Sequence, residues 1–189
     1  MAQDKEIFRV KVTLRGSKPP IWRRFEVPAD VTLYQLHQIL QVMMGWADSH
    51  LHQFQRGRVV YGQSDREFGV RRVNERKTRL HEVLHGQKDR MRYEYDFGDG
   101  WEHELVLEAV TSVSAENRHP RVLKGRGACP PEDVGGMWGY YEFLEAMRDP
   151  KHPNYDDMVG WWGGPFEPDK FDLEGINRVL AKMRLGSDA

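Results

Sequence analysis

The stretch MRYEYDFGDGWEHELVLE, residues 91–108, contains the clearest pattern in the chain and decides the predicted fold. Aromatic side chains alternate with charged ones up to Phe97, and apolar side chains alternate with acidic ones from Trp101 onward. Alternation with a period of two predicts strands that each bury one face. The glycine-rich residues between the two runs therefore predict an antiparallel hairpin.

The parity of the two runs selects the turn of this hairpin. A three-residue loop over 98–100 pairs Phe97 with Trp101 and keeps apolar side chains opposite one another, whereas a two-residue turn would set them opposite acidic ones. We therefore expect the three-residue loop. In that register His103 lies on the aromatic face. Asp96 lies among glutamates on the other face, where, if it is not solvated, it would bind a cation or have a raised pKa.

Working outward from the hairpin, local patterns predict strands before it and helices after it. Thr32 and Gln35 form a capping box, apolar residues follow at helical spacing, and Gly45 is placed to end the helix. The expected elements are strands over 7–14 and 21–27, a helix over 33–44, a strand or two over 50–61, a helical turn over 78–85, and helices over 138–147, 155–162 and from 173 onward. Residues 125–136 are expected to form a loop because of their Gly and Pro content.

Composition bounds the class of protein. The chain has 189 residues, of which 39% are hydrophobic, 11% aromatic and 30% charged. That aromatic content is too high for a disordered chain, and no apolar run approaches the roughly 20 residues of a membrane-spanning helix. We therefore expect a single globular domain over residues 1–189, with no membrane partner.

The start of the chain and its cysteine content indicate a compartment. Residues 1–8, MAQDKEIF, lack the basic and apolar segments of a secretory signal. Cys129 is the only cysteine, so neither an internal disulfide nor a cysteine-rich zinc site can form. Both features favour a cytoplasmic protein.

Charge divides the chain into two halves. Residues 1–90 carry 17 Lys and Arg against 10 Asp and Glu, whereas residues 91–189 carry 11 against 19. The favoured interpretation is that the two halves attract each other within one fold. The alternative is a phosphate-binding surface on the basic stretch from Arg66 to Arg79, which we expect to be an exposed loop. Nucleic-acid binding is not supported beyond that stretch.

Four separated segments carry a family resemblance. They are IWRRFEVP, LYQLHQILQVMMGW with HLHQF, YEYDFGDGWEHELVLE, and GACPPEDVGGMWGYYEFLEAM with DPKHPNY. Together they resemble the plasmid pRiA ORF-three-like family over most of the chain. The resemblance implies an α+β fold, with a roll-like mixed, largely antiparallel sheet packed with several helices and a helical C-terminal third.

Members of this family are often labelled passenger or TnpR-type resolvase proteins of mobile elements, but the resemblance supplies no substrate and no catalytic residue. The resolvase label can be tested on the residues. A serine recombinase needs an activated serine near the N-terminus and a basic DNA-reading helix. Here the first serine, Ser17, lies in a GSKPP turn, and the C-terminal helices are acidic on balance. We therefore do not expect recombinase activity.

Histidines and carboxylates supply the candidate metal ligands. His50 and His52 would point to the same face of a strand, and His103 is a candidate third imidazole. The candidate carboxylates are Asp96, Asp99, Glu132 and Asp133. Such a set could hold a divalent metal that activates water, but hydrogen-bonded histidines without a metal are the favoured interpretation.

Two other patterns are interpreted as structural. His81, Glu82 and His85 match the H-E-x-x-H zinc motif, but Gly86 ends the helix directly after it, so we expect a surface turn. Cys129 would be a nucleophile only beside one of the candidate histidines, and a buried, unreactive thiol is the favoured interpretation.

The residues leave two classes of function open and do not decide whether the chain is an enzyme. The favoured class is a binding or interaction module for an unidentified protein or small molecule, whose recognition surface combines the hairpin loop with residues 128–136. Its candidate ligand-binding residues are Asp96, Asp99, Trp101, Glu132, Asp133 and Trp138. The alternative is a metal-assisted hydrolase, which requires the candidate histidines and carboxylates to converge within coordination distance.

Overall fold

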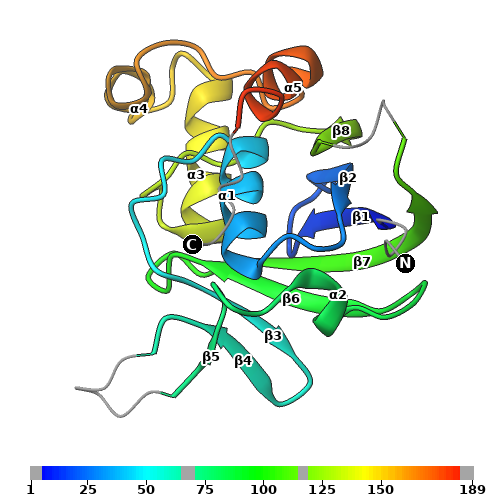
Figure 1. Ribbon diagram of the computed structural model, residues 1–189. Helices are drawn as coiled ribbons and strands as arrows, with labels where there is room; N and C mark the ends of the chain where they lie inside the picture. Colours follow the sequence, from blue (N-terminus) through cyan, green and yellow to red (C-terminus); the bar gives the residue numbers. More distant parts are fainter. Residues whose placement is uncertain (1–5, 65–70, 115–118, 184–189) are drawn as a thin grey trace, which may run out of the picture.

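The computed structural model describes residues 6–64, 71–114 and 119–183, in which one mixed sheet packs against helices (Figure 1). The strands are β1 (Glu6–Leu14), β2 (Trp22–Pro28), β3 (His52–Arg56), β4 (Val59–Gly62), β5 (Val73–Asn74), β6 (Arg90–Tyr95), β7 (Trp101–Ser112) and β8 (Arg121–Arg126). Their order across the sheet is β5-β4-β3-β6-β7-β1-β2-β8. Among these strands β4 and β5 pair in parallel and the other neighbours are antiparallel. The expected α+β fold with a largely antiparallel sheet is confirmed.

The helices follow the sequence patterns closely. They are α1 (Leu33–Met44), α2 (Leu80–Val83), α3 (Gly136–Arg148), α4 (Tyr155–Trp162) and α5 (Leu173–Leu180). The predicted capping box of α1 is present, and Gly45 ends that helix with a left-handed φ of 78°. Asp172 caps α5 through a hydrogen bond from the Gly175 amide. In the described ranges, every helix is too short or too polar to cross a bilayer.

Helix α1 lies across the sheet and supplies much of the core (Figure 1). Its apolar side chains meet the inward faces of β1, β6 and β7, whose residues alternate between buried and more exposed. Full burial of each Leu or Ile in such a core contributes roughly 1.5–3 kcal/mol. Helix α5 packs on β8, the edge strand of the sheet. The Asn177 side chain accepts a hydrogen bond from the Val122 amide and donates one to the Val122 carbonyl of β8.

The register of the β6–β7 hairpin differs from the prediction. Tyr95, not Phe97, is paired with Trp101, so the connection spans five residues, 96–100, and Phe97 is exposed. Asp96 causes this longer loop: its backbone is left-handed (φ 55°) and its carboxylate accepts hydrogen bonds from the amides of Gly98 and Asp99. The shift of two residues keeps the side chains of β6 and β7 on their predicted faces, but it moves Phe97 out of the aromatic face and removes Asp96 from the glutamates of β7.

Two segments predicted as loops contain strands. Strand β8 includes Gly125 and Arg126, because pairing with β2 organises residues whose local sequence favours a loop. In the basic stretch, Arg66 lies outside the described residues, whereas β5 forms at Val73–Asn74. The Arg76 guanidinium lies 3.4 Å from the centre of the Tyr34 ring. The described part of the basic stretch is therefore attached to the fold through β5 and Tyr34, while Arg71, Arg76, Lys77 and Arg79 are exposed as expected.

The oppositely charged halves of the chain meet in the sheet. Arg15 pairs with Glu102, and Arg24 forms a two-point ion pair with Glu108 at 2.5 and 2.8 Å. The interpretation that the two halves attract each other within one fold is consistent with these contacts.

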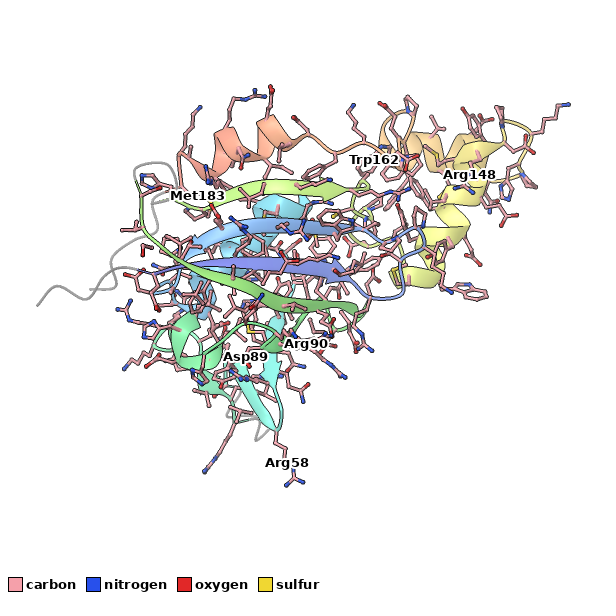
Figure 2. The ribbon with its side chains drawn as sticks, turned by 90° about the vertical axis from the view of Figure 1, so that its right-hand side faces the viewer. Arg58, Asp89, Arg90, Arg148, Trp162 and Met183 are labelled. Carbon is pink, nitrogen blue, oxygen red and sulfur yellow. The ribbon has the colours of Figure 1, made fainter. Side chains whose placement is uncertain are left out.

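Figure 2 shows Arg58 at the tip of the β3–β4 hairpin, far from Trp162 at the end of α4.

Trp101 and His103 do not lie where the proposed sites would need them. Both are fully buried at inward positions of β7, beside core leucines. The His103 Nδ1–H group donates to the Trp101 carbonyl at 2.9 Å, which satisfies one ring nitrogen. Burial lowers the pKa of His103 to about 4. Trp101 is therefore not part of an exposed surface, and His103 belongs to the core.

The depressed pKa of His103 predicts a loss of stability in acid. The unfolded chain binds a proton at this histidine near pH 6.5, whereas the folded protein binds it only near pH 4. His103 alone should therefore lower the free energy of unfolding by about 1.4 kcal/mol per pH unit between these values. Urea unfolding at pH 7.5 and pH 5 should show a smaller pH effect in His103→Gln than in wild type. The exposed-site control His85→Gln should keep the wild-type pH effect; an equal effect in both variants would contradict the assignment.

Candidate functional site

Three segments that are distant in sequence lie together beside β6. They are residues 45–51, which follow α1, residues 96–100, called here the hairpin loop, and residues 128–136, called here the 128–136 loop. The Trp46 indole N–H donates to the Pro130 carbonyl at 3.0 Å, and the Ala47 amide donates to Glu132 Oε2 at 2.9 Å. The 128–136 loop is thus attached to the segment that follows α1.

Tyr95, at the end of β6, links the same segments. Its hydroxyl donates to Glu132 Oε1 at 2.5 Å and accepts from the Ser49 amide at 3.0 Å. Burial of the phenol and its hydrogen bond to the Glu132 carboxylate raise the pKa of Tyr95 to about 12. Tyr95 therefore stays neutral and acts as a hydrogen-bond donor at every pH at which the protein would function.

The hairpin loop contacts the 128–136 loop directly. Asp99 Oδ2 accepts a hydrogen bond from the Gly135 amide at 3.2 Å. Gly136 approaches so closely that a Cβ atom there would lie 2.4 Å from the Asp99 carbonyl oxygen, and its φ of 67° also favours glycine. The two loops predicted to form one surface are therefore adjacent in space.

Two of the four predicted carboxylates, Asp96 and Asp133, converge on His50, whereas Asp99 bonds to Gly135 and Glu132 to Tyr95. Its Nε2 atom lies 3.1 Å from Asp133 Oδ1 and 3.7 Å from Asp96 Oδ2. The Asp133 side chain is 68% exposed, whereas that of Asp96 is 10% exposed, so the group opens to solvent on the Asp133 side. One imidazole and two carboxylates at these separations could hold a metal ion.

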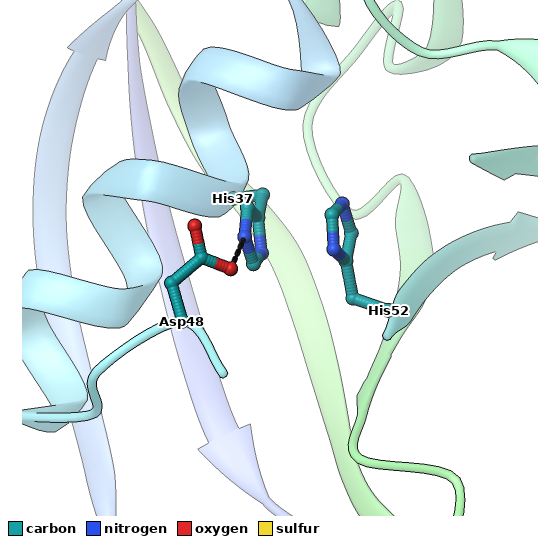
Figure 3. A group of neighbouring side chains, drawn as sticks. All are labelled: His37, Asp48 and His52. Atoms are coloured by element: carbon teal, nitrogen blue, oxygen red, sulfur yellow. Dashed lines mark hydrogen bonds and ion pairs between the residues drawn. The ribbon is translucent and has the colours of Figure 1, made fainter. Parts of the chain in front are cut away.

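His52 does not share this group. Strand β3 begins at His52, so His50 precedes the strand and the alternation of side chains does not relate the two. The His52 ring instead stacks on His37 of α1, with centroids 3.4 Å apart and planes inclined by 4° (Figure 3). Its Nε2 atom lies 2.8 Å from Glu75, which is buried.

His37 belongs to a closed ring of hydrogen bonds. The Gln41 amide group donates to the Tyr93 hydroxyl at 2.9 Å, and that hydroxyl lies 2.8 Å from His37 Nδ1. His37 Nε2 lies 2.7 Å from Asp48 Oδ1, and the Asp48 amide donates back to Gln41 at 3.1 Å (Figure 3). Burial and the charge of nearby His52 lower the pKa of His37 to about 4. Neutral His37, donating from Nε2 and accepting at Nδ1, satisfies every bond of the ring.

The stacked histidines are poorly arranged for a metal, although His37, Asp48 and His52 lie close enough to be considered. The lone pair of an imidazole nitrogen lies in the plane of its ring. Since the two rings are nearly parallel and 3.4 Å apart, their lone pairs cannot meet at one ion without a rotation of one ring. Both nitrogens of His37 also have protein partners. This group is a hydrogen-bonded structural element.

The remaining sequence motifs have structural roles. Glu82 accepts a hydrogen bond from the Arg79 amide at the start of α2, so the glutamate of the H-E-x-x-H pattern acts as a helix cap. The Cys129 thiol contacts the Arg23 guanidinium and Met44, and burial raises its pKa. Both observations agree with the expectation of a surface turn and an unreactive thiol.

Sequence reasoning missed the residues of the hydrogen-bonded ring and its neighbour. They are His37, Gln41, Asp48, Glu75 and Tyr93. A signal was present for two of them: His37 and Gln41 are polar residues at positions that helical periodicity assigns to the buried side of α1, so each needs a buried partner. Asp48 and Glu75 gave no such signal, because they lie in irregular segments.

Comparison with known proteins supports the fold and places the chain in a family. A crystal structure of MM3350 from Methanosarcina mazei Go1, a protein of unknown function, matches with a TM-score of 0.82 at 33% identity, covering 91% of this chain and 98% of that one. The uncharacterised protein y4hQ of Sinorhizobium fredii is 42% identical over 159 residues, 83% of this chain and 81% of that protein. The family model of plasmid pRiA4b ORF-3-like proteins matches residues 6–175. The chain therefore belongs to the plasmid pRiA4b ORF-3-like family.

Proposed function

We propose that this chain is a binding module whose recognition surface is formed jointly by the hairpin loop and the 128–136 loop. The observation that carries the proposal is the direct contact between them, in which Asp99 bonds to the Gly135 amide and abuts Gly136. Loops fixed on a rigid sheet are the usual place for recognition residues, because the scaffold positions them at little entropic cost.

Exposed aromatic side chains flank these loops. Trp138, in the first turn of α3, is 79% exposed, and Phe97 in the hairpin loop is also exposed. The Trp138 indole N–H donates to Glu142 at 2.9 Å, one turn later in α3. Large aromatics mostly bury in a folded protein, and they are enriched at binding surfaces. Their exposure beside the two loops supports a surface that a partner covers.

The charge of the surface indicates the chemistry of the partner. Residues 96–100 and 128–136 contain four carboxylates and neither Lys nor Arg. Such a surface attracts a protein or small molecule that presents a positively charged group. Because the family is named for a plasmid reading frame, extract from a plasmid-bearing bacterium is the first source in which we would seek the partner.

A photo-crosslinking amino acid at position 138 tests this proposal. We expect a discrete adduct with a component of the bacterial extract, because the partner would cover this position. The same probe at position 161 is the matched control, since Trp161 is also exposed but lies in α4.

Asp99→Ala, combined with the probe at position 138, tests whether binding needs both loops or only the side chain at position 138. Loss of the bond to the Gly135 amide should loosen the hairpin loop from the 128–136 loop and reduce the adduct several-fold. Equal labelling at 138 and 161, or labelling unaffected by Asp99→Ala, would contradict the proposed surface.

A metal-assisted hydrolase is the second candidate function. The predicted set of three histidines does not assemble, because His52 bonds to Glu75 and His103 is in the core. The convergence of His50 with Asp96 and Asp133 nevertheless supports a smaller site. A divalent metal held by one imidazole and two carboxylates keeps coordination positions free, and it lowers the pKa of a bound water.

Chromogenic phosphodiesters and acyl esters, assayed with Zn²⁺ or Mn²⁺, test this second candidate. If the chain is a hydrolase of this kind, Asp133→Asn should lower the metal-dependent kcat/KM by at least about tenfold. Asp156→Asn, in exposed α4, should leave it unchanged. Turnover that is absent in wild type, or equal in wild type and Asp133→Asn, would remove the candidate for these substrate classes.

A further inference from the structure

The group formed by His50, Asp96 and Asp133 has the separations of a metal site. Each residue offers one ligand atom, and these atoms all lie within 4.8 Å of one another. Around a tetrahedral Zn²⁺ ion, neighbouring ligand atoms are roughly 3.4 Å apart. The distances of 3.1 and 3.7 Å from His50 Nε2 to the two carboxylates bracket that value.

The Nε2 atom of His50 lies at ion-pair distance from Asp133 but forms no hydrogen bond among the described residues. It is inaccessible to solvent and forms no hydrogen bond of acceptable geometry with any described residue, although carboxylate oxygens lie on two sides of it. A buried ring nitrogen without a partner is costly. A cation placed between His50 and the carboxylates would satisfy the nitrogen and neutralise the negative charge that Asp96 and Asp133 bring together.

The hairpin loop orients the carboxylate of Asp96 before any ligand arrives. Asp96 Oδ1 accepts hydrogen bonds from the amides of Gly98 and Asp99, which leaves Oδ2 directed at His50. Asp96 and Asp133 both adopt left-handed backbone conformations, with φ values of 55° and 60°. Aspartate adopts this conformation more readily than most residues other than glycine.

We propose that His50, Asp96 and Asp133 bind one divalent transition-metal ion of the Zn²⁺ or Mn²⁺ type. An imidazole ligand favours such ions over Ca²⁺ and Mg²⁺, which prefer sites made entirely of oxygen. The exposed side of Asp133 leaves room for a solvent or partner ligand.

This metal site deepens the proposed binding function. The ion would join Asp96 of the hairpin loop to Asp133 of the 128–136 loop, and its role in recognition rests on the proposal that these two loops form one binding surface. The recognition surface would then be assembled fully only when the metal is bound. A partner with a carboxylate or imidazole group could complete the coordination of the ion.

Metal titration of the full chain tests the site. Protein stripped with a chelator and titrated with Zn²⁺ in competition with a chromogenic chelator should bind one ion per chain. His50→Ala and Asp133→Asn should each weaken binding by at least about tenfold. His85→Ala, at an exposed histidine, should retain wild-type affinity. The d–d absorption of the Co²⁺ form should be that of a site with one nitrogen ligand and lose intensity in His50→Ala.

Asp48→Asn distinguishes this site from the stacked histidines. It removes a carboxylate from the other candidate group, so it should not change Zn²⁺ affinity. Affinity that falls with Asp48→Asn but survives His50→Ala and Asp133→Asn would overturn the assignment. Absence of stoichiometric binding in wild type would also overturn it.

A measurement on wild type avoids dependence on the folding of variants. Zn²⁺ should slow amide hydrogen exchange in residues 96–100 and 128–136, with little change in α1. Unaltered exchange in both loops would contradict the bridging role of the ion.

The crosslinking test separates the two proposals. An adduct at position 138 without metal uptake would retain the binding module and reject the metal site. Metal uptake without an adduct would retain the metal site and reject the binding module.

Discussion

The hydroxyl group of Tyr95 is the contact on which the arrangement of the candidate site depends. The Tyr95 ring is fully buried at the end of β6 and stacks on Trp46, with ring centroids 5.0 Å apart. The sheet therefore sets the position of the hydroxyl, which accepts from the Ser49 amide and donates to Glu132. Because one buried group binds both the segment after α1 and the 128–136 loop, the rigid part of the fold dictates where these segments meet.

The two histidine groups differ in how fully their polar atoms are satisfied. His37 is held in a closed ring with Gln41, Tyr93 and Asp48, which leaves neither of its nitrogens free. His50 faces two carboxylates without a hydrogen bond. Asp48 lies in this ring, two residues before His50, but the two groups share no ligand atom.

Elements specified by neighbouring residues were predictable from the sequence. The bounds of α1 follow from its capping box and from Gly45, which act within a few residues of each end. The faces of β6 and β7 follow from alternation, but their register does not, because the turn of Asp96 lengthens the loop. Strand β8 was missed because its pairing with β2 overrides a local preference for a loop.

For the site, the candidate side chains could be named from the sequence, and the tertiary structure decided which of them lie together. The sequence alone determined the α+β class, the family resemblance, and the two loops rich in acidic and glycine residues. The tertiary structure decided that His50 meets Asp133, that His52 stacks on His37, and that Trp101 and His103 are buried. The physical reason is range: periodicity and capping act over a few neighbouring residues, whereas the convergence of side chains depends on strand pairing and packing between segments far apart in the chain.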